Sequence, residues 1–394
     1  MKGFKKIYLD HNATTPVDTR VLKKMMPYFS EKFGNPSSSH ACGKEAREAV
    51  EQARLKISKV LRCTPEELIF TNGGTEAENL AVKGLAFSLK KYGNHTITSV
   101  FEHHAVECSF DYLTKHGFVV SKVSTNKNGF INIEELENLI TEKTILISIM
   151  AANNEIGSIQ PIKEISGLIE EHNKKRKTKN LPPICFHTDS EAAFSYLECN
   201  PQKLGVSALT INGSKIHGPK GVGVLYVKKG CRLATQICGG GQERFLRGGT
   251  ENVPAIIGLG EAAALIYKER EKNKKHVLKL RDFMVKRILA EIPDVKLNSP
   301  QNNCLPHVAN FLFNGINAKD LVELLSQRGI AVSTGSACSS QDSQEISATL
   351  KAIGLSDAEA KSSIRFSLGK LNQKEDMKYL MKILPSVVSR LRKK

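Results

Sequence analysis

The sequence predicts an α/β protein with a doubly wound, mainly parallel sheet and a second, smaller α+β domain. Between about residues 45 and 230, segments with helical spacing of apolar residues alternate with short apolar runs of strand length. Such alternation is typical of parallel sheets, because each parallel pair needs a crossover connection. After Gly241 the alternation stops, and a Gly/Ser-rich stretch follows at 333–343.

The expected helices and strands of the first part follow each other in regular order. Helices are expected at 46–61, 76–92, 133–140 and 162–172. Strands are expected at 68–71, 96–100, 144–150, 184–187, 208–211 and 222–227. In the second part we expect one long helix or two over 253–286, strands within 295–313, a helix at 318–327 and two closing helices.

Length and composition exclude several classes of protein. The chain has 394 residues, 40% hydrophobic and 25% charged, which suits a globular protein of two or three domains. It offers no run of roughly 18 apolar residues for a membrane helix, and its start has no apolar signal-peptide core. Nine cysteines without a CxxC pair argue against a disulfide framework or a metal site and favour a cytoplasmic protein with reduced thiols.

The net charge of +17 comes from 57 Lys and Arg against 40 Asp and Glu. Basic clusters occur at 174–177, 272–275 and 390–394, without interleaved aromatic residues and without any Trp in the chain. This pattern favours a solvated basic surface over direct nucleic-acid binding. Contact with an acidic partner protein or with RNA is the alternative.

Two motifs indicate sites at strand ends. In Thr71–Glu76 a strand ends, two glycines permit a turn and a helix begins, so Gly74 and Thr75 can bind an anion. A plain turn with Thr75 as helix cap is the alternative. Asp189 follows an apolar strand, where it can pair with a protonated pyridine nitrogen or cap a helix.

Two further residues are candidates for covalent chemistry. Lys215 lies just beyond the strand at 208–211 and before a rigid Gly-Pro turn. This position suits a Schiff-base lysine better than the position of Lys220, which is farther from the strand end. A surface lysine in a turn is the alternative. Cys338 lies among small polar residues in 333–340 and is the best candidate nucleophile of the nine cysteines, unless it is an incidental loop residue.

The order of these four motifs resembles the cysteine desulfurases, which are pyridoxal-phosphate (PLP) enzymes of aminotransferase class V. The resemblance spans nearly the whole chain and continues in Tyr8–Pro16, Gly34–His40, Glu102–Val106, Asn153–Gly157, Arg247–Thr250 and Ile364–Ser367. It implies the type I fold of PLP-dependent aminotransferases and a homodimer. It also implies a large PLP-binding domain at 15–255 and a small domain made of 1–14 and 256–394, with a mobile catalytic-cysteine loop at about 333–345.

The resemblance implies a role for each site residue. Lys215 would bind PLP covalently, His103 would stack on its ring and assist proton transfer, and Asp189 would keep its ring nitrogen protonated. The phosphate would be held by Gly74, Thr75, Asn212, Ser214 and, from the partner subunit, Thr250. The substrate carboxylate would be held by Asn154 and Arg365, with a contribution from Asn35.

The implied reaction is desulfuration of L-cysteine to L-alanine, with the sulfur carried as a persulfide on Cys338. An acceptor protein of iron–sulfur cluster assembly or tRNA thiolation would receive it. A selenocysteine lyase or a different class-V lyase is one alternative, and a catalytically impaired PLP-binding scaffold is the second. The second is raised by Ala192, which stands where the family usually has a Gln that donates to the PLP ring oxygen. Asn212 and Ser214 also differ from the Ser and His of many relatives but keep hydrogen-bonding capacity.

Overall fold

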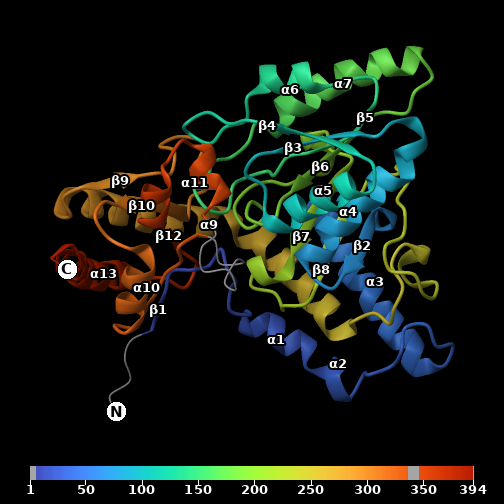
Figure 1. Ribbon diagram of the computed structural model, residues 1–394. Coiled ribbons are helices and arrows are strands. Elements are labelled where there is room, and N and C mark those ends of the chain that lie inside the picture. Colours follow the sequence, from blue (N-terminus) through green and yellow to red (C-terminus); the bar gives the residue numbers. More distant parts are fainter. Residues whose placement is uncertain (1–5, 336–345, 394) are drawn as a thin grey trace.

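The computed structural model describes residues 6–335 and 346–393, and its largest element is a seven-stranded sheet (Figure 1). The strands lie in the order β2 (Leu68–Thr71), β8 (Gly223–Val227), β7 (Ala208–Asn212), β6 (Cys185–Asp189), β5 (Thr144–Ser148), β3 (His95–Ser99) and β4 (Val119–Val123). Only β8 runs against its neighbours in this sheet. The predicted class, a mainly parallel α/β sheet, is therefore confirmed.

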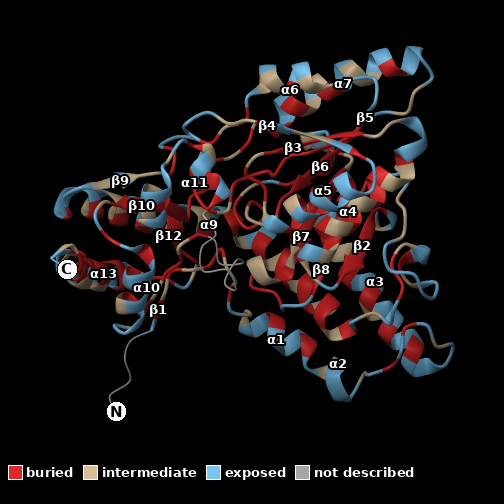
Figure 2. Cartoon of the chain, in the orientation of Figure 1, coloured by how far each residue is buried: buried red, intermediate tan, exposed pale blue. Residues whose placement is uncertain are grey.

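Both faces of the sheet are buried, because alternate residues of a strand point to opposite sides. In β8, Val224 and Tyr226 belong to one apolar cluster and Leu225 to another. The first cluster contains residues of α3 (Ala41–Leu61), α7 (Ile162–Thr178) and the first part of α9 (Val253–Glu291). The second contains residues of α4 (Gly74–Leu89) and α5 (His104–Lys115), so the strands appear as a buried band between helices in Figure 2.

A separate apolar cluster joins the two ends of the chain. Ile7 and Leu9 pack there with residues between 277 and 391, including the second part of α9. The cluster surrounds an antiparallel sheet of β9 (Val295–Leu297), β10 (Val308–Phe313) and β12 (Ser363–Ser367). Its other elements are the pair β1 (Ile7–Tyr8) and β11 (Ile330–Ala331), with α10 (Ala318–Ser326) and α13 (Lys374–Arg392). The domain boundaries stay a prediction.

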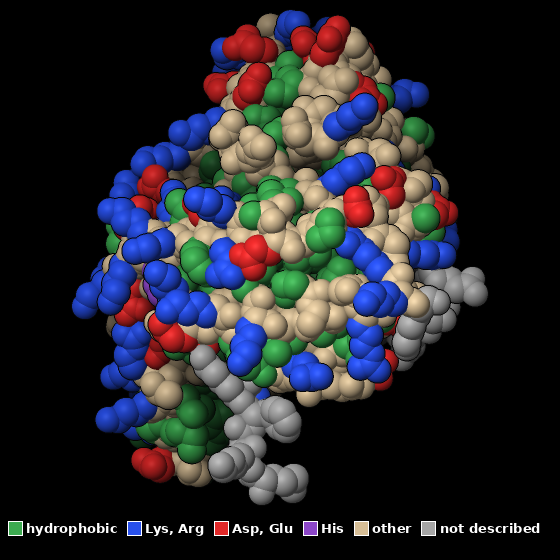
Figure 3. All heavy atoms as spheres, turned by 90° about the vertical axis from the view of Figure 1, so that its left-hand side faces the viewer, with side chains coloured by type: hydrophobic (Ala, Val, Ile, Leu, Met, Phe, Trp, Pro, Cys, Tyr) green, Lys and Arg blue, Asp and Glu red, His purple; other side chains and the backbone are tan. Residues whose placement is uncertain are grey.

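The remaining helices are short and surround these layers. They are α1 (Thr19–Met25), α2 (Pro27–Ser30), α6 (Ile133–Leu139), α8 (Pro201–Leu204), α11 (Ala348–Ala352) and α12 (Asp357–Lys361). In the part of the chain that the structure describes, no helix is long and apolar enough to cross a membrane. Lys and Arg side chains are spread over the face that carries α13 and β9 (Figure 3), a distribution that favours a generally basic surface.

Several expected elements differ from the observed ones. The first long helix begins at Ala41, five residues early, because His40 caps it by accepting from the Gly43 N–H. Strand β4 and helix α5 were not expected, and β4 gave no signal because most of its residues are not buried. The charged segment after residue 253 is one helix that reaches Glu291. The prediction of two closing helices is wrong. Three helices follow residue 346, and β12 lies before the last of them.

Candidate active site

The carboxyl ends of the parallel strands meet at one edge of the large sheet and border a cavity of about 280 Å³. Asp189 is the last residue of β6, and His103 follows the end of β3. Lys215 comes from the turn after β7. The predicted site residues that line the cavity are His103, Asn154, Asp189, Lys215 and Arg365, although they lie far apart in the sequence.

Lys215 is held at the cavity wall by the turn that follows β7. The Asn212 side chain caps this turn by accepting from the Ser214 N–H, and Gly213 N–H donates to the Val222 carbonyl. Lys215 Nζ donates to the carbonyl oxygens of Asn12 and Ala13 at 2.6 and 2.7 Å. Lys220, the other lysine of this segment, is exposed and does not line the cavity.

Asp189 lies in a group of three carboxylates. Its Oδ1 accepts from the Glu191 N–H at 2.8 Å, and carboxylate oxygens of Glu78, Asp189 and Glu191 all lie within 4.8 Å of one another. Burial and the charge of Glu191 raise the pKa of Asp189 to about 6, although His103 and Lys215 oppose the shift. Burial and the charges of Asp189 and Glu191 raise the pKa of Glu78, which accepts a hydrogen bond from Thr210 Oγ1. Such a group stabilises a cation that contacts Asp189.

His103 caps helix α5, which fixes the orientation of its ring. Its Nδ1 accepts from the Ala105 N–H at 3.2 Å, so in the neutral imidazole the proton is on Nε2. The preceding residue, Glu102, is buried and accepts from Ser99 Oγ and the Met150 N–H. Its Oε2 has no hydrogen-bond partner among the described residues, and burial raises its pKa to about 8. The motif around Glu102 is part of the family resemblance, which implies no role for this residue.

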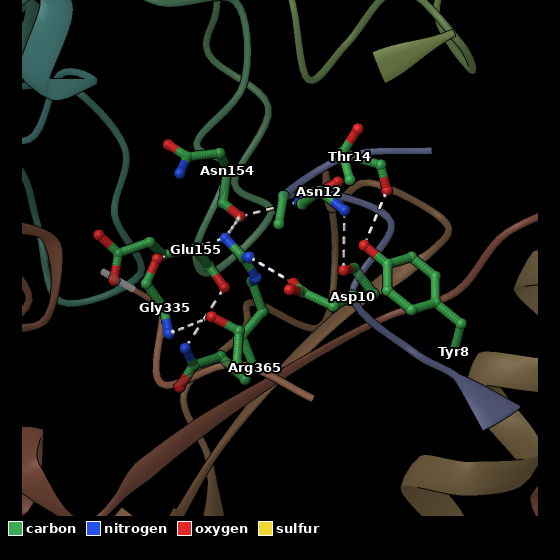
Figure 4. Close-up of polar contacts among 12 residues, drawn as sticks. Tyr8, Asp10, Asn12, Thr14, Asn154, Glu155, Gly335 and Arg365 are labelled. Carbon is green, nitrogen blue, oxygen red and sulfur yellow. Dashed lines mark hydrogen bonds and ion pairs between the residues drawn. The ribbon is translucent and has the colours of Figure 1, made fainter. Parts of the chain in front are cut away.

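Arg365 lies in the middle of β12 and is almost completely buried. One end of its guanidinium donates to Asp10 Oδ1 at 2.8 Å, and the other donates to the carbonyl oxygens of Asn154 and Gly335 at 3.1 and 3.4 Å (Figure 4). Its Nε has no partner within the described part of the chain. Asp10 therefore positions Arg365, a role that the sequence analysis missed because 355 residues separate the two.

The two adjacent asparagines of the Asn153–Gly157 motif differ in their surroundings. Asn153 is buried and builds the turn, because its Oδ1 accepts from the N–H groups of Glu155 and Ile156. Asn154 lines the cavity and receives a hydrogen bond from Asn12 Nδ2 at its carbonyl oxygen. The structure thus separates a structural asparagine from one that can contact a bound molecule.

The predicted anion site lies at the start of α4. Gly73 has φ of 126°, which favours glycine, and a Cβ atom there would meet nothing within 4 Å. Gly74 is the first helical residue and Thr75, the second, is exposed. The Asn212 side chain reaches the same place from the end of β7, where it contacts Glu191.

Four of the residues predicted for the phosphate, Gly74, Thr75, Asn212 and Ser214, do not line this cavity, and three further predicted residues remain. Asn35 is on an exposed turn, where its Oδ1 accepts from the Ser37 N–H, and Thr250 is exposed; neither lines the cavity. Cys338 lies outside the described residues. The residues next to that segment on both sides, Gly335 and Ile346, line the cavity.

Comparison with known proteins gives full-length matches. Residues 7–380 match the family described as "Aminotransferase class-V". The chain is 43% identical over 388 residues to cysteine desulfurase IscS of Dictyoglomus turgidum, covering 98% of this chain and 96% of that protein. It is 42% identical to cysteine desulfurase IscS of Methanosarcina thermophila, covering 98% and 93%.

Solved structures match over similar lengths. A NifS-like protein superposes with a TM-score of 0.91 at 37% identity, covering 98% of this chain and all of that one. A structure described as SspA in complex with cysteine superposes with a TM-score of 0.80 at 36% identity, covering 93% of this chain and all of that one.

Proposed function

We infer that this chain, which belongs to the aminotransferase class-V family, is a cysteine desulfurase that uses PLP. The observation that carries the inference is the meeting of Lys215, Asp189 and Arg365 at one cavity. An amine, an acid for a pyridinium and a guanidinium for a carboxylate are the groups that PLP and an amino acid require together. The further assignments below are part of the same proposal.

The residues at the cavity fit PLP in most respects. The buried Asp189 can face a protonated ring nitrogen, His103 can cover the ring, and Lys215 can bind the aldehyde carbon covalently. Gly74, Thr75, Asn212 and Ser214 offer N–H and hydroxyl donors for the phosphate. The exception is the Glu191 carboxylate, which lies among these donors. When bound, PLP supplies an electron-withdrawing ring that weakens the bonds at the substrate's α-carbon.

The protein residues then orient the substrate and move its protons. Arg365 binds the carboxylate of L-cysteine, and Asp10 keeps the guanidinium in place at 2.8 Å. This grip fixes the amino group and the α-hydrogen relative to Lys215 and His103, which line the same cavity. Lys215 in its neutral form can take the α-proton, and His103 Nε2 can hold or return a proton.

The sulfur acceptor within the chain is Cys338. Its thiolate attacks the substrate's sulfur, so that an S–S bond forms as the carbon–sulfur bond breaks, and the carbon product becomes L-alanine after protonation. Support comes from Gly335 and Ile346, which border the segment of Cys338 and line the cavity. The persulfide then passes to an acceptor protein for iron–sulfur cluster assembly or tRNA thiolation in the cytoplasm.

We further propose that the protein acts as a homodimer. Large apolar side chains are exposed on α1, α2 and the segments that follow them, including Met26, Phe29 and Phe33. Phe245 is 74% exposed and precedes Thr250 by five residues. Exposed large apolar side chains such as these support an interface between protein chains. In such a dimer Thr250 would reach the phosphate site of the partner subunit.

Absorbance and product analysis test this function. The purified protein should show a visible absorbance band from bound PLP and should release L-alanine and sulfide from L-cysteine in the presence of a thiol. Lys215→Ala should lose the band, whereas Lys220→Ala, the control, should keep it. Cys338→Ala should keep the band but stop desulfuration.

The same assays separate the alternatives. A band without turnover would identify the impaired scaffold that Ala192 makes plausible, and a strong preference for selenocysteine would identify a lyase for that substrate. If Lys215→Ala kept covalently bound PLP, the assignment of the lysine would be wrong.

A further inference from the structure

Glu191 lies among the residues that we assign to the cofactor phosphate. We call this group the cup, and it consists of Gly74, Thr75, Asn212 and Ser214. A Cβ atom at position 74 would lie 1.7 Å from Glu191 Oε1 and 2.7 Å from its Oε2, so the carboxylate packs against the Cα atom of Gly74. Gly74 is the first residue of α4, a helix of 16 residues, and a helix N-terminus favours a negative charge. The carboxylate thus has the position and the charge of an anion bound at the start of the helix.

Asn212 fixes the carboxylate there. Its Nδ2 donates to Glu191 Oε2 at 2.9 Å. The orientation of the amide is defined, because its Oδ1 accepts from the N–H and the hydroxyl of Ser214 at 3.1 and 3.0 Å. Two side chains that the sequence assigns to the phosphate, Asn212 and Ser214, are therefore engaged in a chain of hydrogen bonds that ends at Glu191.

The backbone keeps Glu191 within reach of the cup. Its N–H donates to Asp189 Oδ1 at 2.8 Å, and the N–H of Ser190 donates to the Thr210 carbonyl at 3.2 Å. The carboxylates of Glu78 and Asp189 lie within 4.8 Å of that of Glu191. A phosphate group that enters the cup must therefore displace the Glu191 carboxylate, and the acidic side chains of Glu78 and Asp189 lie beside the place that it takes.

We propose that Glu191 is a tethered carboxylate that competes with the phosphate of the cofactor for the start of α4. Binding of a phosphate group requires the side chain to leave Gly74 and to break its hydrogen bond with Asn212. This inference rests on the proposed function, because it takes the cup as the phosphate site of PLP. As a consequence, the protein should bind PLP more weakly than it would without the Glu191 carboxylate.

Equilibrium binding of PLP tests the competition. Cofactor-free wild type, Glu191→Gln and Glu191→Ala are titrated with PLP and followed by absorbance. Because a charge-assisted hydrogen bond is lost on displacement, both variants should bind PLP at least about tenfold more tightly than wild type. The matched control is Glu107→Gln, which removes a carboxylate that lines the same cavity but pairs with Lys122 outside the cup. It should leave the dissociation constant unchanged.

A second measurement does not involve PLP. The thermal midpoint of each cofactor-free protein is recorded in inorganic phosphate and in chloride of equal ionic strength. Phosphate should raise the midpoint of Glu191→Ala and not that of wild type or Glu107→Gln. If PLP bound to none of the proteins, the proposed function would be wrong. The thermal midpoints in phosphate and chloride would then be the only test of whether Glu191 competes with a phosphate group. Equal or weaker binding of PLP and phosphate by the Glu191 variants would overturn the inference.

Discussion

Glu102 is expected to be a neutral carboxylic acid in the folded protein at neutral pH, and the variant Glu102→Gln tests this. The residue is buried beside His103, and burial raises its pKa from 4.5 to about 8. Gln has the same shape and is always neutral. Its carbonyl oxygen can accept from Ser99 and Met150 as Oε1 does in the native side chain.

The magnitude follows from the difference between the folded and unfolded pKa values. A carboxyl group whose pKa is raised by folding contributes stability that is complete below its unfolded pKa of 4.5 and is lost as the pH rises through about 8. Each pKa unit corresponds to about 1.4 kcal/mol, so wild type should lose about 3 to 4 kcal/mol at this residue between pH 5 and pH 8. Glu102→Gln does not ionise and should not suffer this loss.

The assay is urea unfolding of wild type and variant at pH 5, 6.5 and 8. Other titrating groups are common to both proteins, so the difference between the two unfolding free energies isolates residue 102. From pH 5 to pH 8, the unfolding free energy of Glu102→Gln should rise by about 3 to 4 kcal/mol relative to that of wild type. The control is Glu107→Gln, because Glu107 is only half-buried and pairs with Lys122. The difference between its unfolding free energy and that of wild type should stay nearly constant over this pH range. If the difference for Glu102→Gln were also constant, the prediction that Glu102 is neutral in the folded protein would be refuted.

Three further variants test separate parts of the site and fold. Arg365→Lys should raise KM for L-cysteine at least about tenfold with a smaller change in kcat, because a lysine cannot grip a carboxylate with two parallel bonds; steady-state alanine formation measures this, and an unchanged KM would contradict it. Ala192→Gln should raise turnover and shift the visible band, since it restores a donor to the ring oxygen; unchanged rate and spectrum would rule this out. Glu243→Gln should cost about 3 kcal/mol of unfolding free energy in urea, because it removes the buried carboxylate that pairs with the buried Arg54 at 2.8 Å and leaves only the exposed Glu51 as its charged partner; a cost below about 1 kcal/mol would show that the pair contributes little.

The sequence predicted the parts of the site that follow from the sheet. Parallel strands end at a common edge, so the strand-end residues Asp189 and Lys215 could be placed together before any contact was known. The contacts between side chains could not be predicted in this way. Asp10 and Arg365 lie 355 residues apart, and their ion pair depends on how the two chain ends pack in one cluster. Helix α5 was missed, although its cap at His103 lies in a motif that the sequence analysis quoted.

The departures from the family pattern occur at residues that we assign to the cofactor and not at those that we assign to the substrate, a distribution that would separate cofactor affinity from catalysis. Ala192, Asn212 and Ser214 stand where the resemblance implies other residues for the ring oxygen and the phosphate, and the Glu191 carboxylate lies against Gly74 and Asn212. Lys215 and Arg365, which we propose act on the substrate, line the cavity. Loss of binding contacts weakens the affinity for the cofactor, whereas loss of these reacting groups would abolish turnover. The protein should therefore be an active desulfurase whose activity depends on the PLP concentration, and excess PLP should restore a rate that is lost on dilution. A rate independent of added PLP would show that the altered residues bind the cofactor as tightly as the usual residues do.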